Sequence, residues 1–293
     1  MKYRKNAIER SADVLIYISL LFLTFVTLYP VWHVLMASIS DGNELMRRTG
    51  ILLWPAGFSA DAYQVVLQNP AILAGYSNTI FYVIAGTTLN LLLTTLGAYV
   101  LSRKSFLWRT PAMIMIVITM FFSGGMIPDF LLVEGLNLID TPYALILPSA
   151  INTFNLIIMR TVFAAVPDTL EESAKLEGAN DITILFKIYV PISKAVIAVM
   201  VLYYAVAHWN SWFPAMLYLR SRALYPLQLI LREILIMNSL DSMRGNIEFA
   251  DLYRVADTIK YATIIVSTIP ILLLYPFLQK YFVTGVMIGA LKG

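Results

Sequence analysis

The chain contains no cysteine, only two histidines, and little charge of either sign. Of its 293 residues, 13% are charged, and Lys and Arg outnumber Asp and Glu by only 21 to 18. The missing cysteines exclude disulfides and thiolate metal sites, and two histidines are too few for a histidine metal cluster. A net charge of +3 does not indicate a nucleic-acid-binding protein. We therefore expect neither a bound metal nor a nucleic-acid partner.

What the chain has in excess is apolar side chains. They make up 59% of the residues, and the mean hydropathy is +0.74. Ordinary soluble domains are about 45–50% apolar and about 25% charged. A soluble fold of this length cannot bury such an excess, because much of its surface stays in contact with water. An aromatic content of 13% also excludes a disordered chain. The composition therefore predicts a membrane protein.

Six stretches without Asp, Glu, Lys or Arg are each long enough to contain a helix that crosses a bilayer, which needs about 20 residues. They do not show the alternation of barrel strands. The predicted fold is an all-α polytopic membrane protein with six transmembrane helices in one domain, 1–293. We expect helices at 14–36, 80–101, 111–127, 142–159, 195–217 and 261–279. The polar segment 62–77 is expected to be a loop or an interfacial helix.

The distribution of Lys and Arg predicts the orientation, because inner loops carry an excess of both. With both termini inside, the inner segments hold 13 Lys and Arg, and the outer segments hold 8. We therefore predict an N-in, C-in protein. This orientation places the long segment 160–194 inside and the long loop 218–260 outside.

The inner segment contains several signals for helix ends. Glu171 and Lys175 form a favourable i,i+4 pair, and Gly178 stands where a left-handed residue would end a helix. Asn180 or Asp181 can cap a second short helix. Two overlapping pairs fit a capping box at the first helix, Asp168 with Glu171 and Thr169 with Glu172. The loop 166–191 is therefore predicted to be two short helices joined by a glycine turn.

The second of these helices is apolar on one face and is expected to end at Pro191. The face either packs under the protein's own bundle or docks into another subunit, and the residues leave both interpretations open. It is formed by Ile182, Leu185, Phe186 and Ile188.

This loop resembles a known motif. Glu172-Ser173-Ala174, three residues, Gly178, nine residues and Ile188-Tyr189-Val190-Pro191 are similar to the EAA loop of permease subunits in binding-protein-dependent ABC importers. Every spacing matches, and Ser173 and Val190 are mild departures. Segments 122–128, 209–213 and 275–289 resemble the carbohydrate-uptake branch, in particular permeases for acidic polysaccharide fragments such as alginate.

The resemblance implies a type I importer fold, a multi-pass location in a bacterial inner membrane, and an oligosaccharide cargo. The implied partners are a second permease, expected to be a sibling chain, two ATPase subunits and a soluble binding protein. The chain has no P-loop sequence, so ATP and Mg²⁺ would bind the partner ATPases, and we expect no cofactor and no catalysis here. The residues implied in ATPase coupling are Glu172, Ser173, Ala174, Gly178, Ala179, Ile188 and Pro191.

Polar side chains inside the predicted spans are candidates for the cargo pathway, since such groups are costly in lipid unless they are paired or face water. Hydrogen bonds between helices are the alternative role. These candidates are Asn152, Asn155, Tyr203, Tyr204 and His208. In the outer loop, 225–240 is expected to be helical, and the residues after it either contact the binding protein or form a solvated linker. The candidate contacts are Asn238, Arg244, Gly245 and Asn246.

Two other classes of membrane protein fit the sequence less well than a permease subunit does. A secondary transporter more often has inverted repeats and ionisable residues inside its spans, and neither is evident here. An intramembrane enzyme needs a nucleophile, acid pair or metal motif, and no such motif is present. The loop motif therefore favours the permease subunit.

Overall fold

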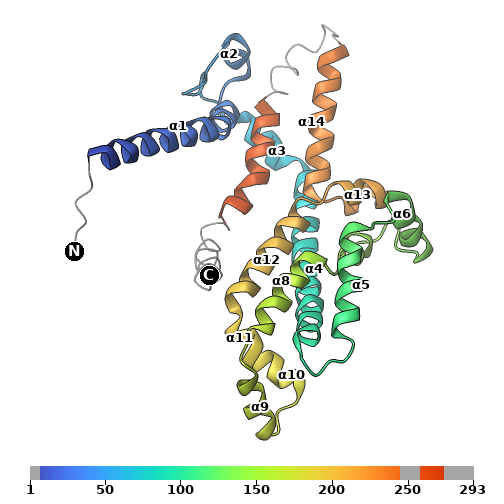
Figure 1. Cartoon of the computed structure of the whole chain (residues 1–293). Helices are drawn as coiled ribbons and strands as arrows, with labels where there is room; N and C mark the ends of the chain where they lie inside the picture. Colours follow the sequence, from blue (N-terminus) through green and yellow to red (C-terminus); the bar gives the residue numbers. More distant parts are fainter. Residues whose placement is uncertain (1–6, 245–257, 274–293) are drawn as a thin grey trace. The chain divides into compact units, whose positions relative to one another are not determined.

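The structure, a computed structural model, describes residues 7–244 and 258–273 (Figure 1). It divides into two compact units, which we describe separately: residues 1–69 with 233–268, and residues 70–232 with 269–293. In the described ranges the secondary structure is helical, and β pairing is limited to an isolated antiparallel bridge between Ser40 and Phe58. The predicted all-α class is therefore confirmed for the described ranges.

The helices follow one another closely along the chain. In the first part they are α1 (Ala7–Ser38), α2 (Gly42–Arg47), α3 (Asp61–Gln68), α4 (Pro70–Ser102), α5 (Arg109–Phe121), α6 (Met126–Gly135), α7 (Tyr143–Ile146) and α8 (Thr153–Ala164). In the second part they are α9 (Asp168–Leu176), α10 (Asp181–Ile184), the π-helix η1 (Leu185–Tyr189), α11 (Val190–Ile192), α12 (Lys194–Trp209), α13 (Phe213–Tyr218), the 3₁₀ helix η2 (Arg222–Leu224) and α14 (Leu227–Arg244). A further helix covers Thr258–Leu273.

In the first unit, α1 carries Glu9, Arg10 and Asp13 in its first two turns and has no charged residue from Val14 on, and none of its most hydrophobic window is buried within the chain. Such a helix needs lipid or another protein around it, because a helix that is hydrophobic all round is not stable in water. Its last turn contributes Met36 and Ala37 to a small cluster with Leu52 and Ala56. Two further bonds join the same end of α1 to its unit, from the Trp32 indole N–H to the carbonyl oxygen of Leu53 and from the backbone N–H of Leu52 to the Tyr29 hydroxyl.

In the second unit, α4, α8 and α12 lie side by side and enclose the largest core cluster (Figure 1). Met159 and Phe163 of α8 and Met200 of α12 are almost fully buried in it. The short helices α9, α10 and α11 gather at one end of this three-helix group, and α6 and α13 lie toward the other end. This arrangement separates the loop 166–191 from the break that follows α12.

Two of the predicted spans are single long helices. α1 covers 14–36, and α4 covers 80–101 but begins at Pro70, ten residues before the expected start. Proline is well tolerated in the first turn of a helix, where its missing N–H would have no partner. The segment 62–77, expected to be a loop or an interfacial helix, is divided between α3, which ends at Gln68, and the start of α4.

Three other predicted spans are interrupted. The stretch 111–127 forms α5 and the start of α6, bent by 115° at a glycine-containing turn where Gly125 has φ +87°. The stretch 142–159 contains α7 and most of α8, and Pro148 lies between them. The stretch 195–217 contains α12 and α13, and Pro214 stands at the start of the latter. A proline cannot donate the backbone hydrogen bond that would continue the preceding helix, which accounts for the last two breaks.

By length and composition, two of the described helices can cross a membrane. Up to four spans result if each of two bent pairs counts as one, Arg109–Phe121 with Met126–Gly135 and Asp181–Ile192 with Lys194–Trp209. The last predicted span, 261–279, coincides with Thr258–Leu273 as far as residue 273, and 274–279 lie outside the described residues. Six crossings and the N-in, C-in orientation therefore remain predictions.

Candidate functional site

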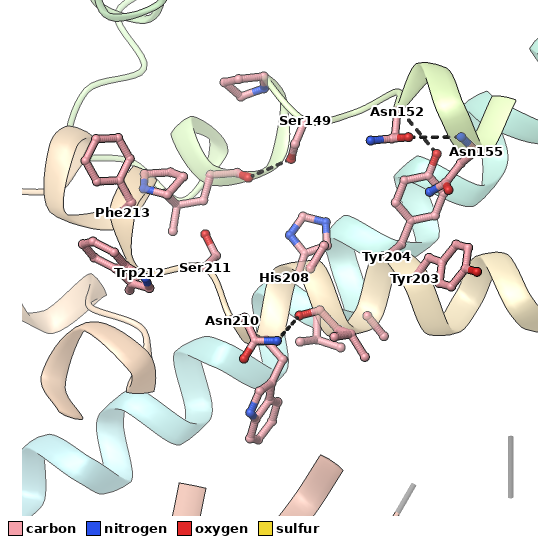
Figure 2. Close-up of a pocket in the computed structure, with 18 of the residues that line it drawn as sticks. Ser149, Asn152, Asn155, Tyr203, Tyr204, His208, Asn210, Ser211, Trp212 and Phe213 are labelled. Carbon is pink, nitrogen blue, oxygen red and sulfur yellow. Dashed lines mark hydrogen bonds between the residues drawn. The ribbon is translucent and has the colours of Figure 1, made fainter. Parts of the chain in front are cut away.

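A cavity of about 890 Å³ opens in the second unit beside α12 and the turn that follows it (Figure 2). Its wall combines aromatic rings with hydroxyl, amide and imidazole groups. Among the described residues that line it, none is Asp, Glu, Lys or Arg. The polar lining residues are Ser149, Asn152, Asn155, Tyr203, Tyr204, His208, Asn210 and Ser211, and large aromatic ones include Phe154, Trp209, Trp212 and Phe213. A neutral, partly aromatic cavity of this size suits a ligand rich in hydroxyl groups.

All five side chains that the sequence proposed for the pathway line this one cavity. They come from two helices that are far apart in sequence, α8 or its N-cap and α12. Tyr203 is 40% exposed, whereas Tyr204, His208 and Asn155 are buried in the wall. The structure therefore brings the proposed set together, and the alternative role in hydrogen bonding between helices also applies to some of its members.

His208 is held by a buried hydrogen bond. Its Nε2 lies 2.7 Å from Oδ1 of Asn90 in α4, and the amide nitrogen of Asn90 donates to the carbonyl oxygen of Ser149. Because the amide nitrogen of Asn90 is used for Ser149, its oxygen faces His208, so Nε2 must carry the proton. Nδ1 is then left as an acceptor, and no described residue donates to it. Figure 2 shows the ring projecting from α12 into the cavity.

Gly86 makes this position of His208 possible. A Cβ added at Gly86 would lie 2.3 Å from His208 Nε2, far inside van der Waals contact. The glycine therefore allows α4 and α12 to approach closely at the site where the imidazole crosses between them.

The interrupted fourth span is also held by side chains. Asn152 is the N-cap of α8, and its Oδ1 accepts from the backbone N–H of Asn155 at 3.0 Å. Tyr204 bonds to Thr94 at 2.6 Å, and its hydroxyl oxygen accepts from the backbone N–H of Asn152 at 3.4 Å. Both groups compensate for backbone bonds that the break removes. Asn152 and Tyr204 therefore have structural roles in addition to lining the cavity.

The loop 166–191 has the predicted plan with one correction. Gly178 has φ +82° after α9, and Asn180 caps α10 through the backbone N–H of Thr183. The expected capping box of α9 is absent, because the N-cap is Pro167 and no side chain caps the helix. The carboxylates proposed for it are used elsewhere: Asp168 pairs with Lys104 and Glu171 with Lys175, the latter at 2.9 Å as predicted.

The two faces of this loop differ. Facing the bundle, Ile184, Leu185 and Tyr189 are buried in the core, with Ala174, Ala179 and Ile188 partly buried against it. Facing away, Glu172, Ser173 and Pro191 are exposed, Leu176 is 91% exposed and Ile182 is 66% exposed. Of the predicted apolar face, Leu185 is buried and Ile188 packs against the core, whereas Ile182 and Phe186 are exposed. Packing under the chain's own bundle is therefore confirmed for part of the face, and docking into another subunit stays a prediction.

The loop 218–260 begins with a hydrogen-bonded junction. Asp140, in the turn before α7, accepts from the backbone N–H groups of Arg220 and Ser221 at 2.9 and 2.7 Å and from the Ser221 hydroxyl at 2.5 Å. These bonds hold the pKa of the Asp140 carboxyl below its usual value. α14 confirms the helix expected over 225–240. The side chains of Asn238 and Arg244, and Gly245 and Asn246 entirely, lie outside the described residues.

Sequence reasoning missed several residues of the cavity and its support. Asn90 is an amide in the middle of a membrane-length helix. Because an unpaired amide is costly in lipid, its position in the sequence could have indicated a functional or helix-bonding role. Ser149, Ser211, Trp212 and Phe213 were not proposed for the pathway, although the last three belong to the segment that resembled carbohydrate permeases. Ser149 reaches the cavity from the break between α7 and α8, and the other three reach it from the break between α12 and α13.

Comparisons with known proteins agree with this arrangement. No protein-family model matches the chain. The chain is 43% identical over 287 residues to the polygalacturonan/rhamnogalacturonan transport system permease protein YtcP of Bacillus subtilis, covering 97% of this chain and 99% of the relative. It is 25% identical to the arabinooligosaccharides transport system permease protein AraQ of Halalkalibacterium halodurans, covering 95% and 96% of the two chains.

Among solved structures, a chain from a bacterial ABC transporter involved in the import of the acidic polysaccharide alginate superposes with a TM-score of 0.87 at 33% identity. The match covers 95% of this chain and 99% of the other. Identity at this level over nearly the full length of both chains shows common descent and a common fold. The chain therefore belongs to the permease proteins of carbohydrate ABC transporters and, like them, is a protein of the inner membrane.

Proposed function

We propose that the chain is the permease subunit of an ATP-driven importer that moves an oligosaccharide delivered by a soluble binding protein. The observation that carries this proposal is the uncharged cavity beside α12, where the sequence-proposed pathway residues meet. Its second permease, expected to be a sibling chain, would complete the pathway.

For the cargo we propose a fragment of an acidic polysaccharide, of the alginate or polygalacturonan kind. The support is the names of two relatives, the permease protein that shares 43% identity and the alginate importer chain. In this cavity the ligand would meet aromatic faces and hydrogen-bonding groups such as the Nδ1 acceptor of His208. Because the described lining has no cation, the carboxylates of the sugar would be matched by the second permease or by water.

This proposal is tested by reconstituting the chain with its candidate sibling, ATPase and binding protein in lipid. ATPase activity is measured with binding protein loaded with an oligogalacturonide, an alginate oligosaccharide or an arabino-oligosaccharide. Stimulation by one of the two uronates supports the acidic cargo. Stimulation by the arabino-oligosaccharide alone contradicts the acidic cargo while leaving oligosaccharide import in place.

We further propose that the loop 166–191 couples the chain to the ATPase, with Glu172 pairing a basic group of that subunit. The support is the outward face of the loop. Glu172 is exposed, no described residue pairs with it, and the apolar side chains of Leu176 and Ile182 stand exposed nearby in sequence. An apolar patch with an adjacent charge is typical of a protein interface.

The coupling proposal is tested by Glu172→Lys in the reconstituted complex, with Glu177→Lys as the matched control. Glu177 is also exposed and acidic, but it occupies a position at which the motif specifies no residue type. Glu172→Lys should abolish the stimulation of ATPase activity by loaded binding protein, whereas Glu177→Lys should keep most of it. Equal stimulation in both variants would show that the ATPase does not recognise Glu172.

A further inference from the structure

A buried polar cluster lies where α4 ends against the loop 166–191. Arg103 follows the last residue of α4, and only 8% of it is exposed. Its guanidinium pairs with the carboxylate of Glu171 in α9, donates to the hydroxyl of Tyr99 at 2.6 Å and lies 3.6 Å from Asp181 in α10. It also lies over the Tyr99 ring at 4.8 Å. One side chain therefore bonds to α4 and to both short helices of the loop.

Glu171 is the centre of the other half of this cluster. Its side chain is 14% exposed and interacts with Arg103, with Lys175 at 2.9 Å, and with the hydroxyl of Tyr189 at 3.1 Å. A carboxylate buried to this degree is stable only when such donors surround it. Glu171 therefore faces inward, whereas its neighbour Glu172 faces outward and is exposed.

The two short helices depend on this cluster to different degrees. Ile184 of α10, with Leu185 and Tyr189 of η1, is buried in the apolar core, so that part of the loop is held by packing. α9 has no buried residue and contributes only Ala174 to the edge of the same core. Otherwise α9 is joined to the end of α4 by two ion pairs. The pair between Arg103 and Glu171 is buried, and the pair between Lys104 and Asp168 is exposed.

We infer that Arg103 is a positioning residue that fixes α9 to the end of α4, so that a displacement of α9 also moves α4. The inference rests on the proposed coupling of the loop 166–191 to an ATPase. The backbone itself joins the loop 166–191 to the cavity through α12. Arg103 would add a second mechanical connection, through α4, because α4 also carries Gly86 and Asn90, which hold His208. Arg103 and Asn90 are thirteen residues apart in sequence, about 20 Å along a helix.

The geometry is tested directly by a spin-label distance. The chain has no cysteine, so Thr169→Cys in α9 and Ile84→Cys in α4, both exposed, give one defined pair. Residues 84 and 103 are roughly 30 Å apart along α4, within the range of pulsed dipolar spectroscopy. We expect a single narrow distance in nanodiscs, with and without ATP-bound ATPase. Arg103→Gln should broaden it, and an unchanged narrow distance in that variant overturns the inference.

The consequence for transport is tested by the number of ATP molecules hydrolysed per sugar imported. Arg103→Gln should raise this ratio at least about twofold, the order of effect seen for coupling residues. Arg103→Lys, which keeps the charge for Glu171 but lacks the fork that also reaches Tyr99, should restore part of the coupling. Lys104→Gln is the matched control, since its ion pair with Asp168 is exposed and exposed pairs contribute little.

These outcomes separate the inference from the proposed coupling. If Glu172→Lys abolishes stimulation while Arg103→Gln keeps the wild-type ratio, the loop couples to the ATPase and the role of Arg103 is wrong. If Arg103→Gln lowers only the yield of folded protein, with the ratio and distance of the remaining protein unchanged, Arg103 is merely structural and the inference also fails. If Glu172→Lys has no effect but the distance broadens in Arg103→Gln, the positioning role stands and the coupling proposal fails.

Discussion

Replacing Gly86 with Ala tests whether His208 is held where the structure places it. The new Cβ would lie 2.3 Å from Nε2 and less than 3 Å from two ring carbons of His208, so the imidazole must move away from α4. Overpacking of this kind costs about 1–3 kcal/mol. A lost side-chain hydrogen bond between helices, here to Asn90, adds about 0.6 kcal/mol on average. The better helix propensity of Ala offsets about 0.5–1 kcal/mol.

The net expectation is a loss of about 1–3 kcal/mol of unfolding free energy, together with a raised KM for the oligosaccharide. Gly97→Ala is the matched control, because it lies in the same helix and its Cβ would meet only the flexible end of Leu156, at 3.2 Å. Equilibrium unfolding in mixed micelles gives the stability of each variant, and uptake in proteoliposomes gives KM. If Gly86→Ala matches Gly97→Ala in both measurements, His208 does not occupy this position and the reasoning is refuted.

Three further predictions concern the other regions. Hydrogen bonds from Ser221 and Arg220 lower the pKa of the Asp140 carboxyl in the folded chain. The stabilisation that they give is therefore present above the pKa of the unfolded chain and is lost as the pH falls through the folded pKa. The melting temperature of the wild type should fall from pH 6 to pH 3, and that of Asp140→Asn should change less. Gly178→Ala should lower the free energy of unfolding by about 1 kcal/mol through backbone strain alone, because φ is +82° and nothing lies within 4 Å of the new Cβ. Gly135→Ala is the control, and equal melting temperatures for the two variants would contradict this prediction. Tyr204→Phe loses the bond to Thr94 and should destabilise the chain by about 0.6 kcal/mol in micelle unfolding; unchanged unfolding would exclude that bond.

The sequence predicted best what depends on local chemistry. The glycine turn at Gly178, the Asn180 cap and the Glu171–Lys175 pair are all present, because each is decided by residues within a few positions of one another. The capping box failed for a nonlocal reason: the donors on Lys104 and Arg103 attract the carboxylates that were expected to cap α9. Local patterns cannot include partners that only the tertiary fold brings near.

The cavity was predicted only in part, for a similar reason. Hydropathy treats 142–159 and 195–217 as uniform spans, although Pro148 and Pro214 interrupt their hydrogen bonding. These breaks turn Ser149 and the Trp212–Phe213 pair toward the cavity. The tolerance for a break depends on side chains from other helices, such as Asn90 and Tyr204, that satisfy the freed backbone groups. That compensation is a property of the folded bundle.

α12 begins at Lys194, separated from α11 by Ser193 alone, and ends at the cavity. Under the proposed function, ATPase coupling and cargo recognition would therefore lie at opposite ends of one helix of sixteen residues. Selection can therefore act on the two ends independently. A change of cargo would then require new side chains in the last turn of α12 and in the segment 210–213, while the contact of the loop 166–191 with the ATPase would stay the same. A chimera that receives 208–213 from a relative with another sugar should keep its own ATPase and accept the donor's cargo. Such a separation would allow one ATPase subunit to serve several importers that differ in cargo.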